Sequence, residues 1–195
     1  FYGKDILELG KISERGEFID SNGSKSKKNI EEAYIRNLIK DISLNENLKI
    51  AWDPGNGAAS NIISKLILKL PGKHYLINGI IDGSFPNHHP DPTIEDNLKQ
   101  LMDVVSKNNC DIGFAFDGDG DRLGVIDCKR RIVWGDQILA ILSRDILRKN
   151  PGAKIIGDVK CSSIFYDEIN RLGGKSIMWA SGHSLIKAKM IEEEA

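Results

Sequence analysis

The sequence has no excess of either charge and no long apolar run. Its 195 residues carry 27 Lys and Arg against 28 Asp and Glu, a formal net charge of −1. Nucleic acids and anionic membranes attract clusters of basic residues, so this balance gives no broad electrostatic reason to bind either partner. No apolar stretch approaches the ~20 residues needed to cross a bilayer, and the charged N-terminal region does not resemble a signal peptide. We therefore expect a cytoplasmic protein.

Cysteine is scarce and shows no pairing pattern. Cys110, Cys128 and Cys161 are an odd number, lie far apart, and form no CxxC or Cys/His ligand spacing. This argues against a disulfide framework and against structural zinc. The hydrophobic content of 41% and the minimal net charge argue equally against intrinsic disorder. One large globular domain or two compact ones would fit the length.

Apolar runs typical of strands alternate with helical patterns, which predicts an α/β fold with a largely parallel sheet. Strands are expected at 48–53, 74–81, 111–117, 154–159 and 175–180. Helices are expected from Ile30, over 58–70, 94–108, 137–150 and 164–172, and from about Ser184. Residues 123–127 and 131–135 flank a polar turn and predict a hairpin. The polar, aperiodic residues 13–29 predict a loop or linker. The simplest interpretation is two consecutive α/β units that meet near Arg130.

The densest chemical signal is an acidic loop directly after the apolar strand at 111–117. Asp117, Asp119 and Asp121 alternate with Gly118 and Gly120, and glycine permits a turn tight enough for alternate side chains to converge. Converging carboxylates repel one another unless a cation lies among them, and Mg²⁺ prefers oxygen ligands. Ligands of open α/β sheets also gather at the carboxyl ends of strands. The loop therefore predicts a Mg²⁺ site.

Two other interpretations of this loop can be compared with the residues. An EF-hand needs Gly at its sixth position and Glu at its twelfth, where this sequence has Arg122 and Cys128. A solvated acidic turn without an ion stays open as an alternative. Arg122 favours the metal site, because a guanidinium beside carboxylates and a cation suits a phosphate held in a bidentate manner.

A second glycine-containing turn follows the strand at 48–53. Its spacing, Gly55-x-Gly57-x-x-Ser60 with Asp82 further on, resembles the dinucleotide-binding fingerprint. Ser60 replaces the third glycine, so the match is weak. We favour a sharp strand-to-helix turn and close packing over a nicotinamide site.

Two further positions have side chains suited to chemistry. Lys160 and His183 each follow an expected strand, where they would share a rim with the acidic loop if the strands run in the same direction. A surface lysine and a packed or capping histidine are the alternatives, and Ser162 or Ser163 is expected to cap the following helix. The loop with His88 and His89 is interpreted as a structural or interdomain element. Lys187 and Lys189 are expected on the solvated face of the last helix.

Five motifs occur together in one order along the chain: AWDPGNGAA, FPNHHPDP, FAFDGDGDRLGV, GDVKCSS and GHSLIKAKM. Together they resemble the α-D-phosphohexomutases, most closely the bacterial phosphomannomutase/phosphoglucomutase group, and the resemblance covers about Tyr34 to Met190. It implies two consecutive three-layer α/β/α domains with mixed, largely parallel sheets, the second truncated. Residues 1–29 would be the tail of a preceding domain and a linker, 30–131 the second domain of the family, and 132–195 an incomplete third domain.

The resemblance also implies a reaction and roles for residues. The family moves a phosphoryl group between O1 and O6 of a hexose through a phosphoserine and a sugar bisphosphate, so hexose phosphates are the implied partners. Asp117, Asp119 and Asp121 would bind Mg²⁺, and Arg122 would contact the transferring phosphoryl group. Lys160 and His183 would face the sugar phosphate.

Parts of the family pattern are absent from this sequence. It has no TASHNP-like serine segment and no GE-x-SGH sugar-reading loop, so we expect a central fragment that is inactive without its flanking domains. A non-catalytic metal- or phosphate-binding module is the main alternative. A nicotinamide-dependent oxidoreductase is a weaker one.

Overall fold

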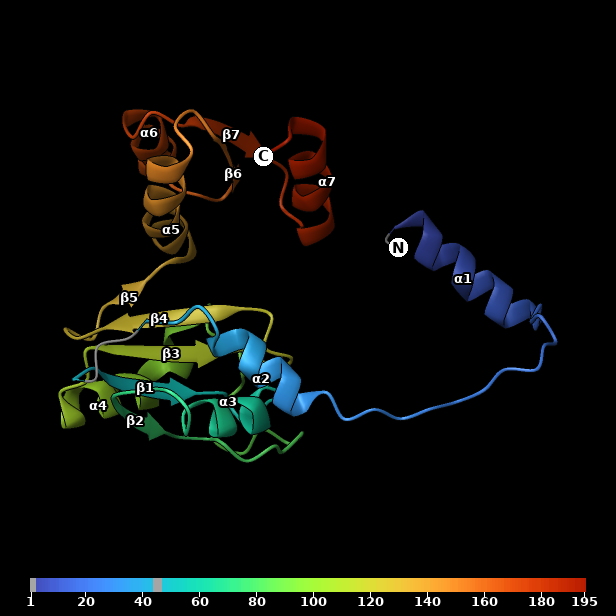
Figure 1. The fold of residues 1–195 in the computed structure, drawn as a ribbon, viewed down its shortest axis with the longest axis horizontal. Coiled ribbons are helices and arrows are strands. Elements are labelled where there is room, and N and C mark those ends of the chain that lie inside the picture. The colour runs from blue at the N-terminus through green and yellow to red at the C-terminus, as the bar shows by residue number, and fades with distance from the viewer. Residues whose placement is uncertain (1–2, 44–46) are drawn as a thin grey trace.

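The computed structural model describes residues 3–43 and 47–195, which form an N-terminal helix and two α/β units (Figure 1). Helix α1 (Lys4–Arg15) stands apart from both units in Figure 1, and an extended segment joins it to the rest. The sequence predicts a loop from residue 13. This prediction is wrong for Ser13, Glu14 and Arg15, because these residues lie in α1. The helix ends at Arg15 and is capped by Gly16, whose left-handed φ of 66° closes the last turn.

The first unit is built on one mixed sheet with the strand order β2-β1-β3-β4-β5. Its strands are β1 (Lys49–Asp53), β2 (Lys73–Leu76), β3 (Ile112–Phe116), β4 (Leu123–Asp127) and β5 (Ile132–Val133). Its helices are α2 (Glu31–Ile39), α3 (Ser60–Leu66), the 3₁₀ helix η1 (Glu95–Leu98) and α4 (Lys99–Asn108). Strand β1 pairs in parallel with β2 and β3, whereas β4 pairs antiparallel with β3 and β5. The predicted hairpin is confirmed, and its second strand, β5, still belongs to the first sheet.

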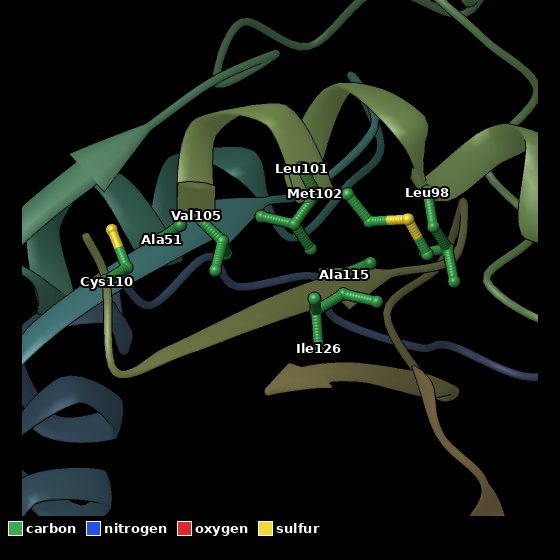
Figure 2. Close-up of a cluster of buried hydrophobic side chains, with 8 residues drawn as sticks. All are labelled: Ala51, Leu98, Leu101, Met102, Val105, Cys110, Ala115 and Ile126. Carbon is green, nitrogen blue, oxygen red and sulfur yellow. The ribbon is translucent and has the colours of Figure 1, made fainter. Parts of the chain in front are cut away.

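Helices cover both faces of this sheet because consecutive strand residues point to opposite sides. Ala51, Ala115 and Ile126 face α4, whose Leu101 and Val105 are completely buried (Figure 2). The alternate residues of β1, Ile50 and Trp52, pack on the other face against Ile63 of α3. The unit is therefore a three-layer α/β/α structure with a core on each side of the sheet.

Three elements are shorter or more divided than their sequence patterns predict. The strand expected at 74–81 ends at Leu76, because Asn78 adopts a left-handed φ of 49° that extended pairing does not allow. The helix expected over 94–108 begins as η1 and becomes α-helical only at Lys99. Helix α3 ends at Leu66, short of the predicted residue 70.

The second unit repeats the layered arrangement on a smaller sheet. Strands β6 (Lys154–Asp158) and β7 (Lys175–Trp179) pair in parallel, with helices α5 (Gly135–Lys149), α6 (Ser163–Arg171) and α7 (His183–Glu193). Leu147 of α5 and Phe165 and Ile169 of α6 form its core, while α7 packs against β6. Ser162 caps α6 by accepting a hydrogen bond from the Ile164 amide, as predicted. The predicted fold class, two consecutive α/β/α units with mixed, mostly parallel sheets, is confirmed.

The last helix differs from its prediction at one lysine. Lys187 is exposed, but Lys189 is buried, with its ammonium 4.5 Å from the ring centroid of Trp179. Lys189 also pairs with Glu193 at 2.7 Å, so its charge is compensated within the fold. None of the helices in the described part of the chain is both long enough and apolar enough to cross a bilayer.

Leu101→Ala tests the core between α4 and the first sheet. Leu101 is 0% exposed, and we expect its truncation to lower the free energy of unfolding by about 2–5 kcal/mol through lost burial and a residual cavity. Leu68→Ala is the matched control because Leu68 is 83% exposed, and it should change stability by less than about 0.5 kcal/mol. Urea unfolding measures both. Equal effects of the two substitutions would contradict the assigned core.

Candidate metal centre

The acidic loop is a tight turn between β3 and β4. The Asp117 amide donates to the Arg122 carbonyl at 3.3 Å, and the Gly120 amide donates to the Asp117 carbonyl at 3.1 Å. Gly120 has a φ of 77°, a conformation that glycine adopts without steric cost. This local folding places the loop at the carboxyl end of β3, as the sequence predicts.

The turn brings the three carboxylates together. One oxygen from each of Asp117, Asp119 and Asp121 lies within 4.8 Å of the others. Asp117 is 1% exposed, whereas Asp119 and Asp121 are open to solvent. The arrangement offers one buried and two accessible oxygen ligands, a donor set that suits a hard cation such as Mg²⁺ with water completing its coordination.

The electrostatics of the loop fit a cation among these groups. The neighbouring carboxylate of Asp119 raises the pKa of Asp121, with burial and Asp117 adding to the effect. Burial acts to raise the pKa of Asp117 as well, but hydrogen bonds from Arg122 outweigh it and lower that pKa overall. Arg122 thus relieves the repulsion between like charges only in part at the exposed end of the loop, where a divalent ion would remove it.

Arg122 lies in direct contact with the acidic loop. Its Nε donates to Asp117 Oδ2 at 2.6 Å, and its backbone amide donates to Asp117 Oδ1 at 3.0 Å. A guanidinium nitrogen also lies 3.6 Å from Asp91. The side chain is still 55% exposed, so the guanidinium can reach an anion that approaches from solvent.

Lys160 and His183 lie in the second unit, at the ends of β6 and β7. Lys160 follows β6, and His183 is the first residue of α7. Both side chains are exposed, and no hydrogen bond or ion pair joins either residue to the acidic loop within residues 3–43 and 47–195. In the view of Figure 1, the arrows of β3 and β7 point toward the same side.

Sequence reasoning missed Asp158, which connects the loops that carry these two residues. Asp158 Oδ1 accepts hydrogen bonds from the Lys160 amide at 2.8 Å and from the Ser181 hydroxyl at 2.6 Å. Its main-chain carbonyl also accepts from the Tyr166 hydroxyl at 2.6 Å. The sequence signal for this role is an aspartate at the end of a predicted strand, because an Asp side chain often accepts a hydrogen bond from the backbone amide two residues further along the chain.

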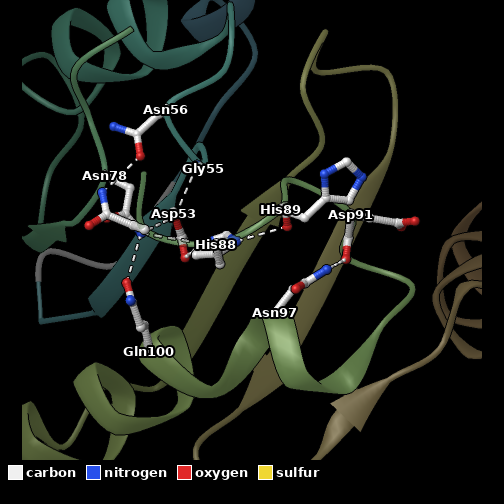
Figure 3. Close-up of polar contacts among 10 residues, drawn as sticks. Asp53, Gly55, Asn56, Asn78, His88, His89, Asp91, Asn97 and Gln100 are labelled. Atoms are coloured by element: carbon white, nitrogen blue, oxygen red, sulfur yellow. Dashed lines mark hydrogen bonds and ion pairs between the residues drawn. The ribbon is translucent and has the colours of Figure 1, made fainter. Parts of the chain in front are cut away.

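A buried polar network fixes the loops that follow β1 and β2 (Figure 3). Asp53 is fully buried, and its carboxylate accepts from the Gly55 amide at 2.9 Å, from Asn78 Nδ2 at 3.0 Å and from His88 Nε2 at 3.0 Å. The other ring nitrogen of His88 faces the His89 carbonyl at 2.9 Å. Both nitrogens of His88 therefore face oxygen acceptors, an arrangement that the doubly protonated ring satisfies fully.

The glycines of the weak dinucleotide fingerprint are covered by other parts of the chain. A Cβ on Gly55 would lie 2.9 Å from Pro90 Cβ, and a Cβ on Gly57 would lie 2.6 Å from the Gly118 carbonyl oxygen. The space that a pyrophosphate would need is filled by Pro90 and by the acidic loop. This favours the close-packing interpretation of these glycines over a nicotinamide site.

Comparison with known proteins places this fold in one class, the alpha/beta/alpha domains of phosphoglucomutases and phosphomannomutases. The family model for phosphoglucomutase/phosphomannomutase alpha/beta/alpha domain II matches residues 32–130, and that for domain III matches residues 134–195. The chain therefore belongs to the phosphoglucomutase/phosphomannomutase family. The matched segments include the acidic loop, Lys160 and His183.

Individual relatives agree with the family assignment. A phosphomannomutase/phosphoglucomutase of Pseudomonas aeruginosa PAO1 is 41% identical over 192 residues, which are 98% of this chain and 42% of the relative. A phosphoglucomutase of Neisseria gonorrhoeae is 39% identical over 190 residues, covering 96% of this chain and 41% of the relative. A crystal structure of a phosphoglucomutase/phosphomannomutase family protein from Burkholderia thailandensis superposes with a TM-score of 0.95 at 38% identity, covering 100% of this chain and 43% of that chain. The chain thus spans about two fifths of the length of these relatives.

Substitution of His88 tests the buried network through its pH dependence. A hydrogen bond to Asp53 raises the pKa of His88, against an opposing effect of burial. The folded state therefore holds this proton more tightly than the unfolded state, whose pKa is about 6.5. The stabilisation is fully present below that pH and is lost as the pH rises through the folded-state pKa.

We expect His88→Gln to lower stability by about 1–3 kcal/mol at pH 5.5, and by less at pH 9. Urea unfolding of wild type and variant at both pH values measures the difference. His89→Gln is the control, because His89 is exposed. A destabilisation that grows with rising pH would contradict an ion pair between protonated His88 and Asp53.

Proposed function

We propose that this chain supplies the Mg²⁺-binding domain and part of the sugar-phosphate-facing domain of a phosphohexomutase. Such an enzyme interconverts hexose 1-phosphate and hexose 6-phosphate, with mannose and glucose phosphates as the expected substrates. The observation that carries the proposal is the convergence of three carboxylate oxygens within 4.8 Å of one another, with Arg122 in contact. The names of the relatives support the same reaction class.

The three aspartates would hold the ion, which when bound neutralises charge on phosphoryl oxygens. Asp117 is positioned by its two hydrogen bonds from Arg122, while Asp119 and Asp121 face solvent and are accessible to an incoming cation. Phosphoryl transfer depends mainly on positioning and on neutralising oxygen charge. The chemistry of this donor set fits that requirement.

The remaining charged groups would bind and orient the substrate. Arg122 keeps more than half of its side chain exposed, so it can donate to phosphate oxygens beside the acidic loop. Lys160 and His183 would face the sugar phosphate from the second unit, where both are exposed at the ends of parallel strands. The phosphoserine that donates the phosphoryl group and the sugar-reading loop would come from flanking domains. We place the enzyme in the cytoplasm.

Asp119→Asn tests the metal assignment. Loss of one charged oxygen ligand should weaken Mg²⁺ binding by at least about tenfold, because hard-cation affinity follows the ligand charge count. Isothermal titration calorimetry of the purified chain with MgCl₂ measures this. Asp167→Asn removes the same charge from an exposed position on α6 and should leave the affinity unchanged. Equal affinity for wild type and Asp119→Asn would show that the ligand assignment is wrong.

The mutase proposal predicts a difference between this chain and the longer protein of which it would form the centre. The 195-residue chain alone should give no turnover of glucose 1-phosphate or mannose 1-phosphate, since no residue in it supplies the phosphoserine. The product of the complete reading frame should turn over at least one of them in a coupled assay. Turnover by the 195 residues alone would contradict the proposal. A longer product that binds Mg²⁺ without turnover would favour the non-catalytic metal-binding module.

A further inference from the structure

The acidic loop is in main-chain contact with the loop that follows β1. The Ala58 amide donates to the Gly118 carbonyl at 2.9 Å. Next to it, Gly57 is buried, and a Cβ at this position would lie 2.6 Å from the Gly118 carbonyl oxygen and 3.1 Å from that of Asp117. Real Cβ atoms do not approach oxygen this closely, so the two main chains can touch only because residue 57 has no side chain.

The loop after β1 cannot easily move away from this contact. At its start, the Asp53 carboxylate holds the Gly55 amide. Further along, the Asn56 amide donates to the Asn78 carbonyl at 2.9 Å, and Asn56 Oδ1 accepts from Asn87 at 2.8 Å. Asn56 is 5% exposed. These buried hydrogen bonds fix the main chain on which the acidic loop rests.

A third segment packs against the acidic loop. Pro90 is buried, and its Cγ lies 3.5 Å from the position that a Cβ would take on Gly118. The neighbouring residue Asp91 faces Arg122 at 3.6 Å. The acidic loop is therefore bounded by the loop after β1 and by the proline-rich loop around Pro90.

We propose that Gly57, Ala58 and Pro90 are positioning residues of the metal centre. Gly118 lies between Asp117 and Asp119, so a displacement of its carbonyl changes the separation of two ligand oxygens. Asp119 and Asp121 are exposed, so burial does not fix their side chains as it fixes Asp117, and their positions depend on the main chain of the loop. The inference rests on the proposed Mg²⁺ site and assigns a role to two loops that contribute no ligand.

Gly57→Ala is the sharpest test. Gly57 does not have a positive φ, so alanine is compatible with its backbone conformation, and the added methyl group acts through its contact with the acidic loop. We expect Mn²⁺ affinity, measured by electron paramagnetic resonance of the free ion, to fall by about tenfold, as for other residues that orient metal ligands. Gly83→Ala is the matched control, because no heavy atom lies within 4 Å of a Cβ at that position, and its affinity should equal that of wild type.

Further measurements separate the possible failures. Circular dichroism shows whether Gly57→Ala is folded, and amide NMR shifts should change at residues 117–122 while those of β6 and β7 stay constant. If a folded Gly57→Ala binds Mn²⁺ as wild type does, the inference is overturned and the metal assignment stands. If wild type itself binds no Mn²⁺, the metal assignment fails and the inference fails with it. If Gly57→Ala does not fold, Pro90→Ala replaces it, and unchanged affinity in that variant overturns the inference.

Discussion

The arrangement of the candidate site depends on the parallel pairing of β1 with β3. In this register Asp53 lies beside Ala115, so the loops that follow the two strands leave the sheet side by side. Parallel strands direct their carboxyl ends to one edge, and loops at that edge must either separate or pack together. Here they pack, with Gly57 against Gly118, and the acidic loop acquires a fixed support.

Local charge matters more at this site than the net charge of −1. Asp117 is buried and is compensated by Arg122 through two hydrogen bonds. The compensation of Asp121 is weaker, since Arg122 Nε lies 3.7 Å from its carboxylate, and Asp119 has no ion pair among residues 3–43 and 47–195. Asp117 is therefore held in place by the protein, whereas Asp119 and Asp121 are available to a cation. This arrangement is expected for an ion that keeps several waters.

The sequence could predict the elements whose signal is local. Short apolar runs predict β1 and β3, and the spacing of Asp117, Asp119 and Asp121 predicts the loop that brings them together. It could not predict the partner of Gly57, because Gly118 lies about sixty positions away and the same glycine spacing also occurs in dinucleotide-binding turns. Burial of Lys189 was missed for a similar reason, since its neighbour Trp179 belongs to a strand and not to its own helix.

In both units, an aspartate that is the last residue of a strand joins two neighbouring loops by hydrogen bonds. Asp53 ends β1, and its Oδ1 accepts from the amide two residues on and from Asn78, in the loop after the adjacent parallel strand β2. Asp158 ends β6, and its Oδ1 accepts from the amide two residues on and from Ser181, in the loop after the adjacent parallel strand β7. A carboxylate at this position satisfies amides that the ladder leaves unpaired and also fixes one loop against the next. In the first unit Asp53 fixes the loop on which the acidic loop rests. In the second unit Asp158 fixes the spacing of the loops that carry Lys160 and His183.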